Sequence, residues 1–128
     1  MRVLAVLLVV AACGPDETIS GYSDREAVWA LESIGGDPVP PGATIRFPAE
    51  GEAVGEGPCN AFRAEQTAPY PWIELGPVAA TRRACPLLAV ETRYFGALER
   101  ATLAEASDRV LILSGGPDGE LVFRRTDP

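Results

Sequence analysis

The side chains that most often carry out catalysis are missing from this chain. Its 128 residues include no histidine and no lysine, and all eleven basic residues are arginines. This composition excludes histidine triads, histidine metal sites, lysine Schiff bases and the lysine of a phosphate-binding loop. Arginine stays protonated in proteins, so it cannot serve as an ordinary general base. We therefore expect a protein that is not an enzyme and that uses no cofactor and no metal.

Carboxylate pairs are the catalytic set that the composition leaves open. Glu91 with Glu99, or Asp108 with Asp118, could be the acid and base of a glycoside hydrolase. That chemistry needs a cleft and a separation between carboxyl groups that the mechanism sets. Spacing along the chain gives neither, so a hydrolase that uses only carboxylates is an alternative that the sequence does not favour.

The first of three cysteines, Cys13, follows an amino-terminal leader. In this leader Arg2 precedes an apolar run over residues 3–10 and then two alanines. A basic residue, a short apolar run and small residues before a cleavage site form a secretory signal. The run is too short for a membrane-spanning helix, which needs roughly 20 residues. We expect residues 1–12 to be a signal peptide.

The four residues that end at Cys13, Val-Ala-Ala-Cys, resemble the lipobox of bacterial lipoproteins. The resemblance implies cleavage before Cys13, a diacylglycerol thioether on its sulfur and a stable anchor of two or more acyl chains. Gly14 stands where enteric lipoproteins of the inner membrane typically have Asp, which favours the outer membrane, facing the periplasm. Residues 13–25 are rich in residues that interrupt helices and strands, which predicts a flexible tether. Secretion without lipid is the alternative.

Cys59 and Cys85 are left as a pair once Cys13 is assigned to lipid. In an oxidising compartment a disulfide is the default for such a pair. Closing a loop of about 25 residues would stabilise the fold by roughly 3 kcal/mol. A metal site is the alternative, but two thiols without histidine make a poor zinc site, and redox cysteines are more often two residues apart. The sequence favours a structural disulfide.

The charge of the chain limits its partners. The net charge is −7 at pH 7, and Arg2 is the one charged residue of the leader. An acidic domain lacks the clustered basic side chains that nucleic acids need. It would also gain nothing from an anionic lipid surface, so acyl chains must hold it at a membrane. We expect one monomeric domain over residues 26–126.

Short strands dominate the predicted secondary structure. In one stretch the spacing of the apolar residues changes from every second residue to every third or fourth, which predicts a helix. The helix is predicted over residues 87–99, just after Pro86, with Phe95 and Leu98 in the core and Glu91, Arg93 and Glu99 in solvent. Three prolines and three glycines over residues 35–42 predict a loop without strand pairing. The fold class is α+β, mostly β: a strongly curved antiparallel sheet or small barrel of about 6–8 short strands with one helix. Alternating apolar residues predict the strands at 27–34, 44–47, 52–55, 59–64, 72–75, 78–81, 101–106, 110–114 and 121–125.

The motifs of the folded part occur in a characteristic order. The most specific are Gly57-x-Cys59-Asn60 and, some twenty residues later, Thr81-x-x-Ala84-Cys85. The set resembles the META domain, or HslJ-like, family of bacterial envelope proteins. Pro58 and Arg83 depart from the Gly and Met that the family usually or often has there, and both cysteines stay in register. The other matching motifs are Trp29-x-Leu31-x-x-Ile34-Gly35, Ile45-x-Phe47, Val54-Gly55, Phe62, Glu91-x-x-Tyr94-Phe95-x-x-Leu98, Leu111-x-Leu113 and Gly119-x-Leu121-x-Phe123.

The resemblance implies a β-rich fold with one helix, similar to that of small pilot lipoproteins of type III secretion. Members are associated with heat-shock response, drug tolerance and motility or virulence, and no catalytic residues carry over. We expect a non-enzymatic envelope lipoprotein, a stress-response or envelope-integrity module that binds a protein partner or a small apolar ligand. The alternative is an inhibitor or secretion-pilot-like lipoprotein that docks on one envelope protein.

Two places in the sequence are candidate interaction surfaces. Tyr70 and Trp72, flanked by prolines, form an aromatic loop of a kind common in binding surfaces. Arg82 and Arg83 could form an anion-binding corner, or they could pair with surface carboxylates, as such arginines more often do. For Asn60, recognition is one interpretation, and the favoured one is that its amide caps backbone groups at a turn.

Overall fold

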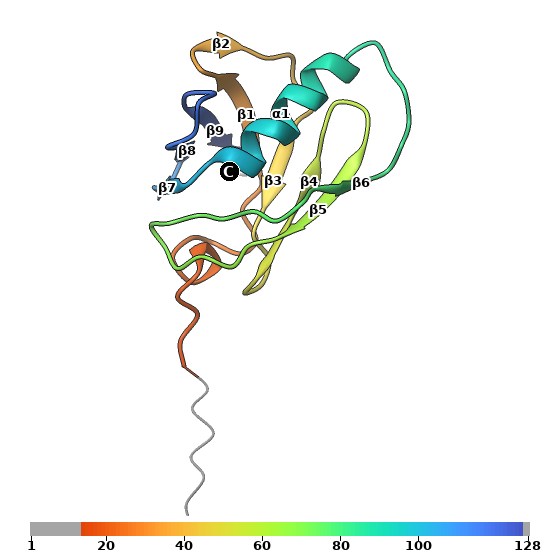
Figure 1. The fold of residues 1–128 in the computed structure, drawn as a ribbon. Helices are drawn as coiled ribbons and strands as arrows, with labels where there is room; N and C mark the ends of the chain where they lie inside the picture. Colours follow the sequence, from red (N-terminus) through yellow and green to blue (C-terminus); the bar gives the residue numbers. More distant parts are fainter. Residues whose placement is uncertain (1–13, 127–128) are drawn as a thin grey trace, which may run out of the picture.

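The computed structural model describes residues 14–126 (Figure 1). The predicted signal peptide and Cys13 lie outside the described residues, so the signal peptide, its cleavage and the lipidation stay predictions. No helix within this part of the chain is long and apolar enough to cross a membrane. The elements are η1 (Ile19–Gly21), β1 (Trp29–Ile34), β2 (Asp37–Pro38), β3 (Thr44–Arg46), β4 (Glu52–Glu56), β5 (Ala61–Glu65), β6 (Ala79–Ala80), α1 (Leu88–Arg100), β7 (Leu103–Ala106), β8 (Val110–Ser114) and β9 (Leu121–Arg125).

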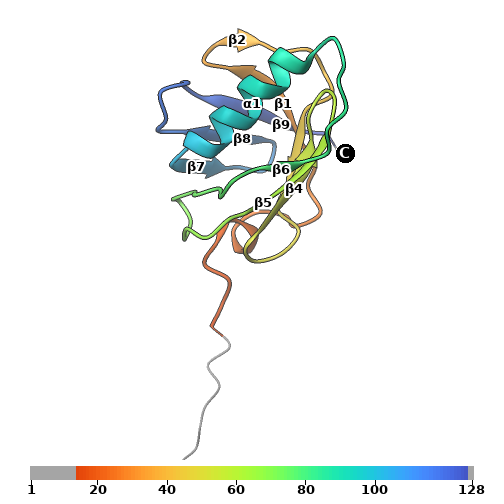
Figure 2. The ribbon, with the colours of Figure 1, turned by 45° about the vertical axis from the view of Figure 1, so that its right-hand side comes forward.

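The strands form one antiparallel sheet that curls strongly into a half-barrel. Their order is β6-β5-β4-β3-β1-β9-β8-β7, and β2 pairs with β1 outside this path. Helix α1 lies across the sheet (Figures 1 and 2). Its Tyr94 is fully buried, with ring centroids 5.8 Å from Phe62 of β5 and 6.2 Å from Phe123 of β9. The predicted fold class is confirmed, and the predicted helix differs from α1 by one residue at each end.

Alternation along the strands places one face of the sheet in the core. In β8, Leu111 and Leu113 are buried, and in β9 the buried pair is Leu121 and Phe123. These pairs lie directly opposite each other in the register, Leu111 against Phe123 and Leu113 against Leu121. Because side chains opposite each other on one face pack together, β8 and β9 contribute a continuous apolar layer to the core.

The segment over residues 66–75 bridges the two ends of the sheet. Gln66 forms an isolated bridge with Leu75, and Trp72 forms one with Leu103 of β7. The backbone N–H of Ala104 also donates to the Pro71 carbonyl oxygen at 2.8 Å. The predicted strand at 72–75 is therefore wrong. Residues 72–75 form only two isolated bridges, one with Gln66 of the same segment and one with Leu103 of β7, which are too few to make a ladder.

A short hairpin occupies residues that were predicted to form an unpaired loop. In β2, Asp37 pairs with Ile34 and Pro38 pairs with Ser33. The two-residue turn between the strands has Gly35 and Gly36 with positive φ values of 57° and 85°, the conformation that tight hairpins require. Proline is tolerated there because β2 is an edge strand. The two glycines were predicted to prevent strand pairing, and they are the residues whose turn allows β1 and β2 to pair.

The residues before β1 are packed on the domain. Ile19 of η1 is only 1% exposed. Asp16 accepts hydrogen bonds from the Thr18 backbone N–H at 2.8 Å and from Arg25 at 3.0 Å, and the Tyr70 N–H donates to the Glu17 carbonyl at 2.7 Å. The tether is therefore shorter than the predicted residues 13–25, because the chain is packed on the domain from Asp16 onward and Ile19 is part of the apolar core.

The Asp16 carboxylate is held in its charged form by this packing. Burial by itself raises its pKa, but hydrogen bonds from Ser20 and Thr18, together with the charge of Arg25, outweigh that effect and lower the pKa below its ordinary value. The side chain thus fixes the start of the folded chain by accepting bonds from three later residues.

Candidate functional site

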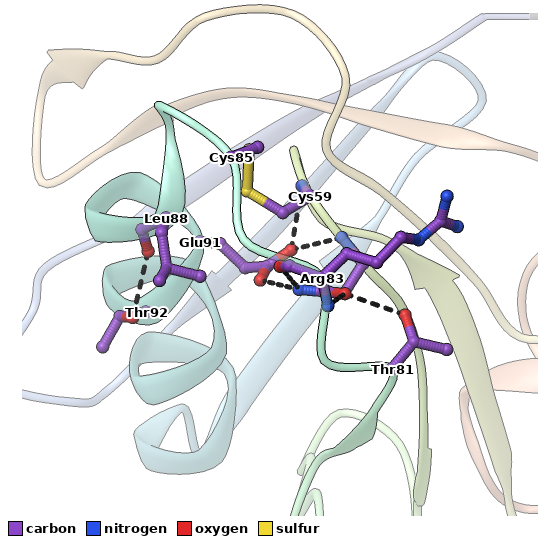
Figure 3. Close-up of a disulfide and its surroundings, with 8 residues drawn as sticks. Cys59, Thr81, Arg83, Cys85, Leu88, Glu91 and Thr92 are labelled. Atoms are coloured by element: carbon purple, nitrogen blue, oxygen red, sulfur yellow. Dashed lines mark hydrogen bonds between the residues drawn. A yellow bond between two sulfur atoms is a disulfide. The ribbon is translucent and has the colours of Figure 1, made fainter.

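A buried carboxylate lies where α1 meets the turn before β5. Glu91, in the first turn of α1, is only 3% exposed. Its Oε1 accepts from the backbone N–H groups of Cys59 at 3.0 Å and Asn60 at 2.7 Å, and its Oε2 accepts from Asn60 Nδ2 at 2.7 Å (Figure 3). No basic side chain of residues 14–126 forms an ion pair with it. The prediction that Glu91 is solvated is wrong.

Asn60 links this carboxylate to the segment that precedes α1. Its Nδ2 also donates to the Arg83 carbonyl oxygen at 2.9 Å. Its Oδ1 accepts from the Arg83 backbone N–H at 2.6 Å and from the Thr81 hydroxyl at 2.9 Å. The amide therefore satisfies backbone groups at a turn, which confirms the capping interpretation over recognition.

The disulfide between Cys59 and Cys85 closes the same region (Figure 3). The two Cα atoms are 5.6 Å apart across a sequence separation of 26 residues. The predicted pairing is confirmed. Asn60, Glu91 and this disulfide together form what we call the Asn60–Glu91 cluster, which ties the turn before β5 to the start of α1.

Gly57 leaves the space in which the carboxylate of this cluster sits. Its N–H donates to the Asn60 carbonyl at 2.7 Å, which closes a tight turn around Pro58 and Cys59. A Cβ atom at residue 57 would lie 2.9 Å from Glu91 Cγ, closer than carbon atoms normally approach. The Gly-x-Cys-Asn motif therefore combines the room for the carboxylate with the groups that bind it.

The carboxylate pairs considered for hydrolysis are not brought together. Glu91 and Glu99 are eight residues apart on one helix, or about 12 Å along its axis, and Glu99 accepts instead from the Val78 N–H at 2.9 Å. Asp108 and Asp118 lie at opposite ends of β8. Arg100, through its hydrogen bond, holds the pKa of Asp118 below its ordinary value. Residues 14–126 also contain no cluster of three or more acidic or cysteine side chains that could hold a metal.

Among the surface grooves that reach β6, the strand at one end of the sheet, two also extend to Thr81. The first measures about 530 Å³ and the second about 400 Å³. They share Ala80 and Thr81, and most of the first is apolar. We call β6, these grooves and the segment up to Ala84 the β6 edge. The first groove is lined by Glu52, Val54, Ala61, Phe62, Arg63, Ala79, Ala80 and Thr81, and the second by Asn60, Val78, Ala80, Thr81, Arg82, Arg83, Ala84, Leu88, Glu91 and Phe95.

Arg82 and Arg83 line the second groove and are exposed. All seven ion pairs found over residues 14–126 are made by other arginines. The expected pairing of these two arginines with surface carboxylates is therefore not found in the described chain. An anion-binding role for them stays a prediction.

Tyr70 and Trp72 lie away from these arginines. Tyr70 is half-buried, stacks on Tyr22 with ring centroids 4.9 Å apart, and accepts from the Ala106 N–H at 3.1 Å. Trp72 is 56% exposed. The loop that carries them and the segment from β6 to α1 lie on opposite sides of the molecule in both views (Figures 1 and 2). The four predicted residues therefore form two separate surfaces.

Comparison with known proteins supports the fold. A family model described as META domain matches residues 24–128, and no curated protein matches the chain. The NMR structure of a protein from Burkholderia xenovorans is 22% identical, covers 91% of this chain and 94% of its own, and has a TM-score of 0.66. A second NMR structure is 21% identical over 78% of this chain and 89% of its own, with a TM-score of 0.62. A crystal structure of a duf4847 family protein from Bacteroides vulgatus is 16% identical over 67% and 60%, with a TM-score of 0.55.

Proposed function

We propose, since the chain belongs to the META domain family, that it is a non-enzymatic lipoprotein of the bacterial cell envelope whose domain binds a partner protein at the β6 edge. The leader and the lipobox-like residues before Cys13 support the location. A disulfide between Cys59 and Cys85 fits an oxidising compartment. The lipid would hold the acidic domain at the outer membrane, facing the periplasm.

The observation that carries the binding proposal is the pair of arginines without ion pairs beside apolar grooves. In a chain of net charge −7, carboxylates are plentiful, yet none of those in residues 14–126 pairs with Arg82 or Arg83. Arginine enriches protein interfaces and binds carboxylates through two parallel hydrogen bonds. A partner segment with apolar side chains and an acidic residue therefore matches this surface. Since β6 ends the sheet, an extended segment could also pair with its edge.

Replacing Cys13 by serine tests the anchor. The variant should appear in the soluble periplasmic fraction, because without acyl chains an acidic domain has no attraction to a membrane. The measurement is fractionation followed by immunoblotting, with the wild-type protein in the membrane pellet as reference. Continued membrane association of the variant after a salt wash would contradict the anchor.

A photo-crosslinking residue at Ala79 tests the binding surface. In intact cells it should give a discrete protein adduct, and the double variant Arg82→Glu, Arg83→Glu should lose most of it. Each charge-assisted contact is worth about 1.5–3 kcal/mol, or roughly a tenfold change in affinity or more. The adduct is measured by immunoblotting and identified by mass spectrometry.

The control is Arg109→Glu, which reverses one positive charge, against two in the double variant, in the turn between β7 and β8. It should leave the adduct unchanged. Equal loss in both variants would mean that only the overall charge matters, and equal adducts in all three would exclude the arginines. A co-purified apolar molecule in place of any protein adduct would assign the grooves to a small ligand.

A further inference from the structure

The start of the described chain is fixed to the domain very close to Cys13. Asp16 accepts hydrogen bonds from Thr18 and from Ser20 and pairs with Arg25 at 3.0 Å, and the next residue, Glu17, accepts from the Tyr70 N–H. The side chain of Asp16 is only 8% exposed. The described chain is therefore fixed to the body of the domain from Asp16 onward.

This position limits how far the domain can move from a lipid on Cys13, and the inference rests on that proposed anchor. Cys13 and Asp16 are three residues apart, which spans about 10 Å at most in an extended chain. The headgroup region on each side of a bilayer is about 5–7 Å thick. A lipidated Cys13 would therefore place the surface around Asp16 at or within the headgroup region.

The surface around Asp16 carries the most exposed aromatic side chains of the described chain. Tyr22 is 59% exposed and Trp72 is 56% exposed. Tyr22 stacks on Tyr70, whose N–H binds Glu17, and the Trp72 N–H donates to the Pro69 carbonyl at 2.9 Å in the same turn. The amino-terminal segment leaves the molecule at the end where this loop lies (Figures 1 and 2).

We infer that Tyr22 and Trp72 enter the headgroup region of the membrane that holds the lipid, and that they fix the orientation of the domain on it. Tryptophan and tyrosine favour this region because one part of each ring is apolar and another forms hydrogen bonds. Since the chain is acidic, anionic lipid headgroups would not attract it. The start of α1, which lies at the opposite end of the molecule from the amino-terminal segment, then points away from the membrane.

Tryptophan fluorescence of the lipidated full-length mature protein tests this orientation. The chain has two tryptophans, and Trp29 is only 1% exposed, so quenching by acrylamide reports Trp72. On vesicles of phosphatidylcholine and phosphatidylethanolamine, Trp72 should lose most of its acrylamide quenching and gain quenching by a headgroup nitroxide lipid. The reference is the Cys13→Ser protein mixed with the same vesicles, and Trp72→Phe gives the background.

A tryptophan at the other end of the molecule is the matched control. Leu88→Trp in the Trp72→Phe background places an exposed indole at the start of α1. It should stay open to acrylamide and should not be quenched by the nitroxide lipid. Protection of this residue instead of Trp72 would reverse the orientation and overturn the inference.

The remaining outcomes separate the orientation from the anchor. If the wild-type protein floats with the vesicles while Trp72 is as accessible as in Cys13→Ser, the orientation is wrong and the anchor stands. If mass spectrometry finds no lipid on Cys13 and the protein does not float, the anchor fails and the inference fails with it. Protection of Trp72 in native envelopes but not on pure lipid would assign the loop to a protein partner and overturn contact with lipid.

Discussion

Replacing Glu91 by alanine is expected to lower the free energy of unfolding by about 3–4 kcal/mol, a large part of the 5–15 kcal/mol typical of a domain. The change removes the acceptor of three hydrogen bonds, from the Cys59 N–H, the Asn60 N–H and Asn60 Nδ2. Each buried donor left without a partner costs about 1–3 kcal/mol. Asn60 Nδ2 keeps its bond to the Arg83 carbonyl, so its loss is the smallest. Urea unfolding followed by circular dichroism gives the value.

Two further variants test whether the loss of stability comes from the buried carboxylate or from any substitution in α1. Glu91→Gln keeps the shape but turns one acceptor into a donor, so we expect a loss of about 1–2 kcal/mol, between wild type and alanine. Glu99→Ala removes an exposed carboxylate on the same helix that accepts one bond from Val78, and it should cost less than 1 kcal/mol, or about the value of a surface contact. Similar losses at residues 91 and 99 would show that the Asn60–Glu91 cluster does not stabilise the fold as described.

Removing the disulfide by the double change Cys59→Ala, Cys85→Ala is expected to cost about 3 kcal/mol, because the unfolded chain regains the freedom of a loop of some 26 residues. The midpoint of urea unfolding should fall accordingly. Wild-type protein treated with dithiothreitol should fall to nearly the same midpoint. The double variant itself is the control, since reductant should not change its unfolding; a wild-type midpoint that is insensitive to reductant would contradict a stabilising disulfide.

The disulfide and the carboxylate should not act independently. Cys59 contributes both a sulfur to the disulfide and an N–H to Glu91, so loosening either one affects the other. In a double-mutant cycle we expect the combined loss to be smaller than the sum of the two separate losses by about 0.5–3 kcal/mol. A strictly additive result would mean that the turn holds its shape without the disulfide.

The regular elements and the disulfide could be predicted from the sequence because each has a local signal. The alternation of apolar and other residues predicted β8 and β9. The change to helical spacing after Pro86 predicted both ends of α1 to within one residue. The pairing of Cys59 with Cys85 followed from their number once Cys13 was set aside. The turn at Gly35 and Gly36 was misread, because the glycines that break strands are also the glycines that tight hairpins need.

The inner structure of the candidate site could not be predicted because its partners are distant in sequence. Glu91 was placed in solvent because it is charged, yet the donors that bury it lie 31 and 32 residues earlier. One local signal was present: Glu91 shares a helix face with Tyr94 and Leu98, three and seven residues on, and both are buried. A charged residue on the apolar face of a helix predicts a buried partner. Likewise, Ile19 was assigned to a tether because a single apolar residue gives no periodic pattern. Its burial is visible only in the folded structure.

The pairing of the first long strand with the last one sets the order in which the molecule can assemble. β1 and β9 lie side by side in the middle of the sheet, with Leu31 opposite Phe123, although some ninety residues separate them along the chain. Until β9 is in place, the β7–β8 hairpin has no connection to β1, and both halves of the sheet expose unpaired edges. Pairing between such distant segments is slow to form. A growing chain would therefore stay open until β9 is made. If the chain is exported as proposed, this late closure would keep it unfolded while it passes through a translocation channel.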